Sequence, residues 1–468
     1  MSSAASVPPA VSSGANARLG IIGGGQLARM TALAAAPLGV DVTVIEKAPL
    51  SPGAQVVHRA LTGDWSDPAA LARFAQGLDV ITLENEFIDA DLLRGLEETG
   101  VPVFPTWGTM SLTQDKLIQK RTLAAAGLPV PEFREVTAPA DVVAAGAEFG
   151  WPLVLKARRN GYDGKGNFTL RSAADVPAGW EKLGGGRVAL YVEAFWPFQS
   201  ELAAIVTRGR NGESVIYPVV ETIQRDHICH EVLAPAPVAP AIAARATDVA
   251  GRAVAAVRAV GSFGVEMFLS SDGRIAVNEL APRVHNSGHY TIEGCVCSQF
   301  ENHVRAVLGW PLGRPDLVAP AVVMVNLLGT RPGTGRAEGL AAALAVEDAH
   351  VHLYGKATSA AGRKLGHVTA RGRDLAEARE RARRAPQAHH APRSHVPPGK
   401  TQTKGCSSNR ATDRGAPPRG APQPRQEPSA AMANSGWRSS LLSRPSARAG
   451  QAIPAELRAG SAMFICRL

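Results

Sequence analysis

The 468-residue chain is 45% hydrophobic and carries 50 Lys or Arg and 41 Asp or Glu residues. Residues 385–468 hold 12 of these basic and 3 of these acidic residues, which leaves 38 of each sign before them, so the net charge of +9 belongs to this tail. A neutral body gives no support for a nucleic-acid binder, and no apolar stretch approaches the length of a membrane span. We therefore expect a cytoplasmic protein of several domains, with no nucleic-acid or membrane partner.

An alternation of apolar strands and helices opens the chain. Three strands are predicted, at 19–23, 42–45 and 80–83. A helix predicted over 26–38 follows the glycines Gly23 to Gly25. This order predicts a parallel α/β layer, preceded by a flexible N-terminus over residues 1–17, which are rich in Ser, Ala and Pro.

The first glycine loop fits two kinds of site. The pattern Gly23-x-Gly25-x-x-Ala28, with Glu46 ending the next strand, matches the dinucleotide fingerprint and on its own predicts an NAD(P)-dependent oxidoreductase. Backbone N–H groups at a helix start, however, attract any phosphate or carboxylate. The oxidoreductase interpretation gives no role to the motifs downstream, so we keep it as the weaker alternative.

A second glycine loop lies in the middle of the chain, at 161–167, between strands predicted at 153–156 and 168–170. Its glycines let a hairpin fold its backbone over phosphates, and Lys165 supplies charge. Lys156 and Lys116, which lies in a helix predicted over 115–126, add two more cations. No G-K-[ST] sequence and no helix follow the glycines, so the loop resembles the lid of an ATP-grasp enzyme rather than a Walker loop.

Two acidic residues are expected to meet across a hairpin. Glu266 lies in a strand predicted over 264–269, and Glu279 follows the apolar strand 274–277 after a short turn. Antiparallel pairing would bring the two carboxylates together, which is unfavourable without a cation. Because Mg²⁺ is commonly held by one or two carboxylates, we predict a Mg²⁺ site at this pair, with the amide of Asn278 beside it.

The polar turn after Glu279 presents Arg283, His285 and Asn286 within a few residues. A guanidinium and an imidazole can hold a small anion and stabilise charge that develops on it. The remaining elements are expected as strands and helices of the central and C-terminal parts: strands at 189–193, 201–207, 215–220, 321–327 and 349–353, and helices at 241–260, 295–308 and 374–384.

The five cysteines form no disulfide framework, because their number is odd and their positions are scattered. Cys295 and Cys297 with His303 lack a fourth ligand for zinc, and we expect buried thiols in a helix. The last two strands are predicted to form a third, smaller unit, followed by the cations Lys356, Arg363 and Lys364.

Five motifs occur in an order that resembles the 5-(carboxyamino)imidazole ribonucleotide synthases, a family of ATP-grasp enzymes of purine biosynthesis. The resemblance covers about residues 18 to 384. The motifs are the Gly-x-Gly-Gln-Leu start at Gly23, Thr82-x-Glu84-x-Glu86, Gly161-Tyr162-Asp163-Gly164-Lys165-Gly166, Asn278 to His289, and Tyr354-Gly355-Lys356 with Gly362 to His367.

The resemblance implies an α/β (α+β) ATP-grasp architecture. It comprises a pre-ATP-grasp domain like that of biotin carboxylase (18–112), an ATP-grasp domain (113–312), a small β-rich C-terminal domain (313–385) and a disordered tail (386–468). The implied reaction is ATP- and bicarbonate-dependent carboxylation of the exocyclic amine of 5-aminoimidazole ribonucleotide. Carboxyphosphate is the intermediate, ADP and phosphate are released, and Mg²⁺ is required. A homodimer is also implied.

The resemblance also assigns roles to residues. Arg283, His285 and Asn286 would be catalytic and bind bicarbonate, then carboxyphosphate, and Glu266 and Glu279 would hold Mg²⁺. The hinge carboxylates Glu193 and Glu201 would meet the adenine amine and the ribose hydroxyls. The full ATP set is Lys116, Lys156, Gly161, Tyr162, Asp163, Gly164, Lys165, Gly166, Asn167, Glu193, Ala194, Phe195, Trp196, Glu201, Gln224, Asn278 and Glu279. The ribonucleotide set is Tyr162, Asp163, Glu86, Gln26, Lys356, Arg363 and Lys364, the last three on its phosphate.

The sequence departs from the family at three places. Gln224 stands where a His is usual, and Asn167 replaces the usual Gln. Family members end soon after the helix that begins near Asp374, so the third domain is expected to be incomplete here. Two explanations fit the residues that follow: a frameshift in the coding sequence, or a genuine disordered extension.

Other ATP-grasp ligases share much of this chemistry. A formate-dependent glycinamide ribonucleotide transformylase or a biotin carboxylase would use the same lid and paired carboxylates. The cluster of Lys356, Arg363 and Lys364 favours a ribonucleotide phosphate over the acceptor of a biotin carboxylase.

Overall fold

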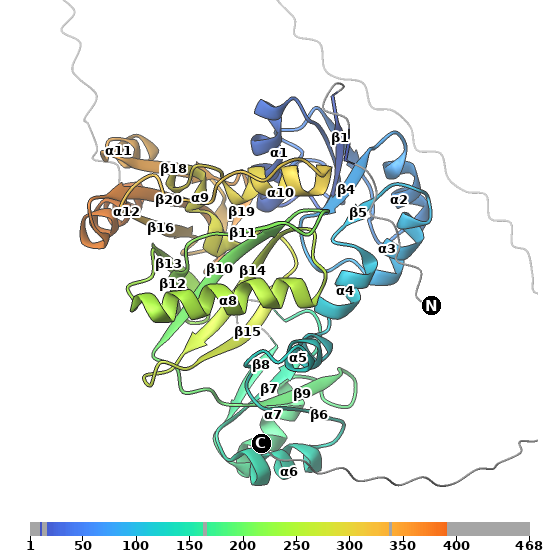
Figure 1. Ribbon diagram of the computed structural model, residues 1–468, viewed down its shortest axis with the longest axis vertical. Helices are drawn as coiled ribbons and strands as arrows, with labels where there is room; N and C mark the ends of the chain where they lie inside the picture. The colour runs from blue at the N-terminus through green and yellow to red at the C-terminus, as the bar shows by residue number, and fades with distance from the viewer. Residues whose placement is uncertain (1–9, 12–15, 162–165, 337–338, 391–468) are drawn as a thin grey trace, which may run out of the picture. The chain divides into compact units, whose positions relative to one another are not determined.

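The computed structural model describes residues 10–11, 16–161, 166–336 and 339–390, drawn in colour in Figure 1. Of the predicted disordered tail, only residues 386–390 are described. They continue helix α12 (Leu375–His390) rather than leaving it. Within the described residues no helix is both long and apolar enough to cross a membrane.

The first layer is a parallel sheet in the order β3-β2-β1-β4-β5. Its strands are β1 (Arg18–Ile22), β2 (Asp41–Glu46), β3 (Arg59–Thr62), β4 (Val80–Leu83) and β5 (Val103–Phe104). Its helices are α1 (Gln26–Ala35), α2 (Pro68–Ala75), α3 (Ala90–Glu97) and α4 (Trp107–Thr113). The predicted parallel layer is confirmed, although the predicted helix over 26–38 becomes a 3-10 turn at Ala36–Leu38, where Pro37 removes a backbone donor.

A four-stranded antiparallel sheet follows, in the order β6-β9-β7-β8. Its strands are β6 (Phe133–Val136), β7 (Leu153–Ala157), β8 (Asn167–Leu170) and β9 (Leu190–Ala194), with helices α6 (Pro139–Phe149) and α7 (Val176–Lys182). Helix α5 (Lys116–Ala125) precedes it and is capped by Asp115, whose carboxylate accepts the N–H groups of Leu117 and Ile118.

The largest sheet runs β15-β14-β10-β12-β13-β16-β20-β18, with β11 also paired to β10. Its strands are β10 (Ser200–Arg208), β11 (Ser214–Ile216), β12 (Val220–Arg225), β13 (Ile228–Ala234), β14 (Gly261–Leu269), β15 (Ile275–Ala281), β16 (Ala321–Leu328), β18 (Ala349–Leu353) and β20 (Lys364–Gly372). The smaller elements are α9 (Thr291–Gly294), α10 (Gln299–Leu308), α11 (Leu340–Leu344), β17 (Gly333–Thr334) and β19 (Thr358–Ser359).

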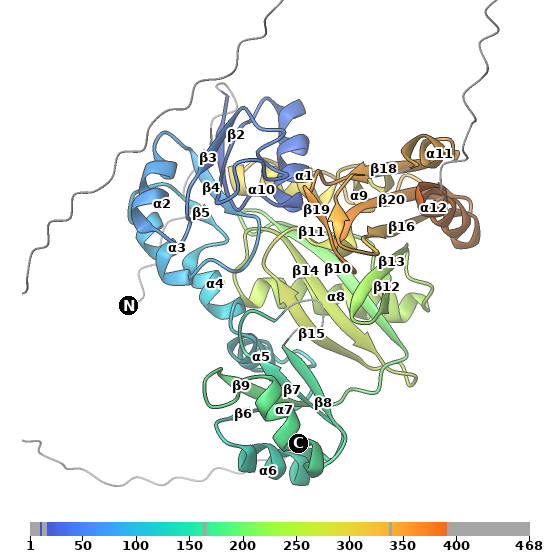
Figure 2. The ribbon, with the colours of Figure 1, turned by 180° about the vertical axis from the view of Figure 1, so that it is seen from behind.

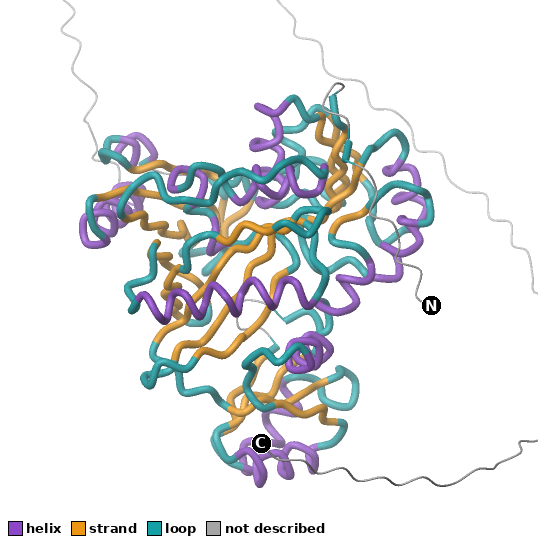
Figure 3. Tube along the Cα trace, in the orientation of Figure 1, coloured by secondary structure: helices purple, strands orange, loops and turns teal. Residues whose placement is uncertain are grey.

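Helix α8 (Pro240–Ala256) covers one face of β10, β14 and β15, as Figures 1 and 3 show. Its Val249 and Ala253 pack with Val265, Met267 and Val277 of these strands in a fully buried apolar core. Figure 2 views the same strands from behind. The face of these strands that is turned away from α8 carries the candidate site.

Several sequence predictions are corrected. The strand predicted at 215–220 is two strands, because Pro218 cannot donate to a ladder. Cys295 and Cys297 are buried free thiols, as expected, but they precede α10, which begins after the N-cap Ser298. The strands predicted at 321–327 and 349–353 extend the central sheet, because β16 pairs with β13 and β18 joins β16 through β20.

Candidate active site

The two predicted metal carboxylates face each other across β14 and β15, where Glu266 pairs directly with Glu279. The strand register shifts at this point and leaves Asn278 as an extra residue of β15, a β-bulge. Val277 and Leu280 both pack into the core beneath α8. The bulge therefore places two successive side chains, Asn278 and Glu279, on the other face, beside Glu266. The sequence had suggested that the strand ends at Val277, before these two residues. In the structure both lie within β15.

The charges of this pair suit a divalent cation. Burial and the neighbouring Glu279 raise the pKa of Glu266 above its usual value. Burial would also raise the pKa of Glu279, but the ammonium of Lys116, ion-paired with it, holds that pKa below its usual value. The Asn278 Nδ2 lies 3.5 Å from Glu266 Oε2. Two carboxylates and an amide oxygen match the hard ligands of Mg²⁺, and Lys116 supplies positive charge at one of them.

No group of three or more His, Cys, Asp or Glu side chains in the described ranges is arranged to hold a metal. This finding is compatible with Mg²⁺, which takes its remaining ligands from water and phosphates. His303, which the sequence places near Cys295 and Cys297, uses both ring nitrogens elsewhere: its Nδ1 accepts the Ser262 N–H at 3.0 Å and its Nε2 lies 2.8 Å from Thr82 Oγ1.

A second cluster of charges lies where β7, β9 and α5 meet. The Glu193 carboxylate pairs with Lys156 Nζ at 2.6 Å and Lys120 Nζ at 3.0 Å, and the Tyr191 hydroxyl donates to it at 3.1 Å. Although burial opposes the charge, the two ammonium groups lower the pKa of Glu193 to about 2. Burial lowers the pKa of Lys120, whose side chain is 1% exposed, to about 8. Both oxygens of Glu193 thus contact protein groups.

Sequence reasoning missed Lys120, although a signal existed. It follows Lys116 by four residues in α5, so both lysines lie on one helix face. Lys120 Nζ also donates to the Val277 carbonyl at 3.0 Å. It therefore connects the strand that carries Glu279 with Glu193.

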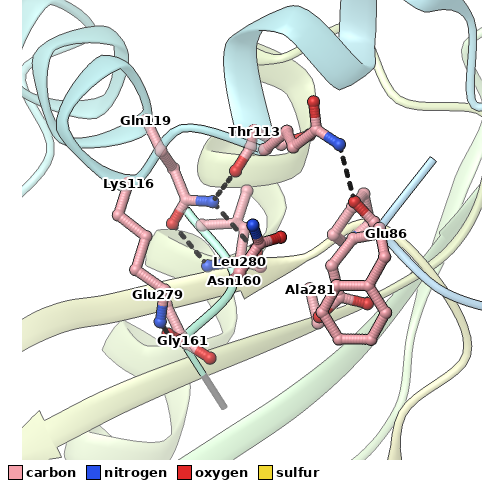
Figure 4. A pocket seen from close by; sticks show the side chains of 12 residues that line it. Glu86, Thr113, Lys116, Gln119, Asn160, Gly161, Glu279, Leu280 and Ala281 are labelled. Atoms are coloured by element: carbon pink, nitrogen blue, oxygen red, sulfur yellow. Dashed lines mark hydrogen bonds and ion pairs between the residues drawn. The ribbon is translucent and has the colours of Figure 1, made fainter. Parts of the chain in front are cut away.

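A pocket lies between α5, the end of β15 and the residues Asn160 and Gly161 that open the second glycine loop (Figure 4). Gln119 closes one side: its Nε2 donates to the Leu280 carbonyl at 2.9 Å, and its Oε1 accepts the Leu280 N–H at 2.8 Å. Lys116, Glu279 and Glu86 also line the pocket. Of the predicted lid residues, Tyr162, Asp163, Gly164 and Lys165 lie outside the described residues, whereas Gly166 and Asn167 lead back into β8.

The predicted adenine and ribose contacts lie beside this cluster. Ala194 ends β9, and Phe195 is exposed in the connection to β10. The buried Trp196 Nε1 has no hydrogen-bond partner in the described part of the chain. Glu201, whose pKa burial raises, accepts a hydrogen bond from Gln224 of the adjacent strand. Glu201 and Gln224 therefore interact on the face that carries Glu266.

The predicted anion segment begins with Arg283, which makes a bidentate ion pair with Glu86 (2.5 and 3.0 Å). His285 follows; its Nδ1 lies 2.8 Å from Ser287 Oγ, and its Nε2 lies 3.4 Å from Glu266 Oε1. The ring lies so close to β14 that a Cβ at Gly264 would come within 2.6 Å of it. The metal carboxylates and the anion segment are thus direct neighbours.

Of the three predicted phosphate cations, Lys356 lies just before β19, Arg363 lies between β19 and β20, and Lys364 begins β20. Arg363 Nη1 donates to Thr358 Oγ1 at 2.5 Å, and Lys356 lies over the Tyr354 ring. Lys364 is near enough to Glu266 to lower its pKa. From the first layer, Gln55 Nε2 donates to the Gly355 carbonyl at 2.8 Å.

The first glycine loop encloses acidic side chains of the chain itself. Glu46 accepts the Gly24 N–H at 2.9 Å, and the buried Glu84 accepts the Leu27 N–H at 3.3 Å. A Cβ at Gly25 would lie 2.3 Å from Glu84 Oε1, so only glycine fits there. These carboxylates occupy the N–H groups that a dinucleotide would need, which removes the support for the oxidoreductase alternative. Gln26 begins α1 beside this loop.

Comparison with known proteins agrees with this geometry. Three family models match successive parts of the chain: the ribonucleotide synthetase preATP-grasp domain (16–114), the ATP-grasp domain (121–300) and the phosphoribosylaminoimidazole carboxylase C-terminal domain (322–381). The N5-carboxyaminoimidazole ribonucleotide synthase of Mycobacterium tuberculosis (strain H37Rv) is 42% identical over 381 residues, which cover 81% of this chain and 89% of that protein. The chain belongs to the N5-carboxyaminoimidazole ribonucleotide synthase family.

Two solved synthase structures from Aspergillus clavatus are also similar. The one complexed with ATP is 38% identical, with a TM-score of 0.73 and coverage of 80% of this chain and 98% of that chain. The one in complex with ADP and 5-aminoimidazole ribonucleotide is 36% identical, with a TM-score of 0.72 and coverage of 79% and 98%. The synthase family and ATP-grasp architecture predicted from the motifs are confirmed.

Proposed function

We propose that this chain is a ligase that uses ATP and bicarbonate to carboxylate 5-aminoimidazole ribonucleotide in purine biosynthesis, releasing ADP and phosphate. Membership of the synthase family supports the reaction. The structural observation that best supports the proposed reaction is the 3.4 Å contact between His285 Nε2 and Glu266 Oε1. This contact joins a carboxylate pair suited to Mg-ATP to a segment suited to bicarbonate. ATP and bicarbonate are the two reactants that must meet first.

The residues around ATP neutralise and position it. Lys116, Lys156 and the 161–167 loop would hold the phosphates, and Glu201 with Gln224 would meet the ribose. Because both oxygens of Glu193 contact other groups, we assign it to orienting Lys156, and leave adenine to Ala194, Phe195 and Trp196. Mg²⁺, held by Glu266 and Glu279 with Asn278, would neutralise phosphate charge. Phosphoryl transfer needs such positioning more than a protein nucleophile.

Bicarbonate would lie against Arg283, His285 and Asn286. An oxygen of bicarbonate attacks the γ-phosphorus, the bond to ADP breaks, and carboxyphosphate forms. Loss of phosphate then gives CO₂, which the exocyclic amine captures as a carbamate while the amine loses a proton. Glu86 holds the guanidinium of Arg283 at two points and so fixes its plane.

The ribonucleotide would lie on the side of the bicarbonate that faces away from ATP. Lys356, Arg363 and Lys364 would hold its phosphate, and Tyr162, Asp163, Glu86 and Gln26 complete the predicted set. We retain the domain boundaries 18–112, 113–312 and 313–385, a homodimer and a cytoplasmic location as proposals.

One assay tests the reaction. ADP release is measured with Mg-ATP and bicarbonate, with and without 5-aminoimidazole ribonucleotide. We expect ribonucleotide-dependent release, and on the order of a 100-fold loss of kcat/KM for bicarbonate in Arg283→Ala, because a preorganised donor to the reacting anion is removed.

Arg314→Ala is the matched control, since Arg314 is an exposed arginine whose ion-pair partner among the described residues is Asp316. Release that depended on formate and glycinamide ribonucleotide instead would favour the transformylase. Full turnover by Arg283→Ala would contradict the bicarbonate assignment.

A further inference from the structure

A single amide interrupts the apolar run of β16. Asn326 lies between Val325 and Leu327, and it is 5% exposed. Such a buried amide is costly unless its hydrogen bonds are made. Its partners therefore indicate why it is there.

The Asn326 amide makes three hydrogen bonds. Its Nδ2 donates to the Cys229 carbonyl at 3.0 Å and to Asn286 Oδ1 at 2.8 Å. Its Oδ1 accepts from Asn286 Nδ2 at 3.0 Å. The two asparagines thus form a reciprocal amide pair that is anchored at one end by a backbone carbonyl.

The anchor decides which way both amides point. A backbone carbonyl can only accept, so the group of Asn326 that faces Cys229 must be its NH₂. The oxygen of Asn326 then faces Asn286 Nδ2, and the oxygen of Asn286 faces Asn326 Nδ2. A flipped Asn286 would set donor against donor and acceptor against acceptor.

This orientation determines how many hydrogen-bond donors Asn286 has left. Its amide has two N–H donors, of which Asn326 takes one. Among the described residues no acceptor takes the second. The second N–H of Asn286 therefore remains available for a small anion.

We propose that Asn326 is a positioning residue that holds the Asn286 amide so that an N–H is offered to bicarbonate. The inference rests on the proposed function, since it is that function which places bicarbonate at Asn286. Asn326 lies in the region matched by the C-terminal domain model, whereas Asn286 lies in the ATP-grasp region. The C-terminal domain would thus set the geometry of the bicarbonate site as well as supply the phosphate cations.

The test is Asn326→Asp, which keeps the shape but removes the NH₂ group. We expect the KM for bicarbonate to rise about tenfold, while the KM for ATP stays within about twofold, because only the anion site loses its donor geometry. While the introduced carboxyl is protonated, it can still donate one O–H, and it loses this donor when it ionises. The ratio of mutant to wild-type KM for bicarbonate should therefore grow as pH rises from 6 to 8.

Asn302→Asp is the matched control. Asn302 is also buried and donates to Tyr217 and to the Gly313 carbonyl, away from the site. This variant should lower the melting temperature without separating the two KM values. Should Asn326→Asp not fold, Asn326→Ser, which is too short to reach both partners, tests the same split.

An unchanged KM for bicarbonate, or equal changes in both KM values as for a general loss of structure, would overturn the inference. Wild-type protein without ribonucleotide-dependent ADP release would instead overturn the proposed function itself. The two failures are therefore distinguishable.

Discussion

At the residue scale, the site depends on charges that are buried in pairs. Lys120 is the clearest example, because its ammonium is almost fully buried between Glu193 and the Val277 carbonyl. Breaking a buried pair from one side costs far more than the pair itself contributes, since the other charge stays buried.

We expect Lys120→Met to lower the free energy of unfolding by about 3 to 5 kcal/mol, because Glu193 keeps only one of its two ammonium partners. Urea unfolding at neutral pH measures this. Lys182→Met, at an exposed lysine over the Phe168 ring, should cost less than about 1 kcal/mol. Equal losses in both variants would refute the assignment of Lys120 as a buried structural charge.

At the element scale, the β-bulge in β15 is the feature that assembles the metal carboxylates. A regular strand alternates its faces, so Asn278 and Glu279 could not both lie beside Glu266. The extra residue at Asn278 allows this while Val277 and Leu280 stay in the core. Bulges near active sites commonly re-aim side chains in this way.

Deletion of Asn278 should leave the fold intact, because a regular register would still bury Leu280 and still pair Glu279 with Glu266. Affinity for Mg-ADP should fall on the order of tenfold, since both the amide and the local twist are lost. Calorimetric titration gives the affinity, and Asn278→Ala separates the loss of the amide from the loss of the bulge. Unchanged affinity after the deletion would show that the bulge has no part in binding.

At the scale of the whole molecule, a buried hydrogen-bond chain connects the first layer with the central sheet. The Ser262 N–H donates to His303 Nδ1, so the proton of this neutral ring lies on Nε2, which faces Thr82 Oγ1. Thr82 in turn donates to the Phe104 carbonyl at 2.7 Å. This series of hydrogen bonds therefore requires an uncharged His303. Burial lowers the pKa of His303 to about 4.

This requirement predicts a pH dependence of stability. The unfolded state takes up a proton near pH 6.5 and the folded ring only near 4, so stability falls as pH drops through this window, by about 3 kcal/mol from His303 alone. Buried His289 and His367 act in the same direction.

Unfolding measured at pH 7, 5.5 and 4.5 tests this, with His303→Gln expected to lose part of the slope while keeping a donor and an acceptor. His58→Gln, at an exposed histidine, should keep the full slope. A slope unaltered by His303→Gln would rule out the proposed linkage.

The sequence by itself determined the family, the types of residue in the site and the positions of most long strands. These features are local: motif order, alternation of apolar residues and the residues that follow each strand can be read without knowing what packs where. The pairing of Glu266 with Glu279 was also within reach, because a short turn joins their strands.

Only the tertiary structure decided the partners. Lys120 with Glu193, Glu86 with Arg283 and Asn326 with Asn286 join residues far apart in the chain, and nothing local marks one as the neighbour of the other. The continuity of the central sheet through β13 and β16 depends on the same kind of long-range pairing. Charge burial and donor geometry arise only when distant segments pack, so the chemistry of this site could be named from the sequence but its orientation could not.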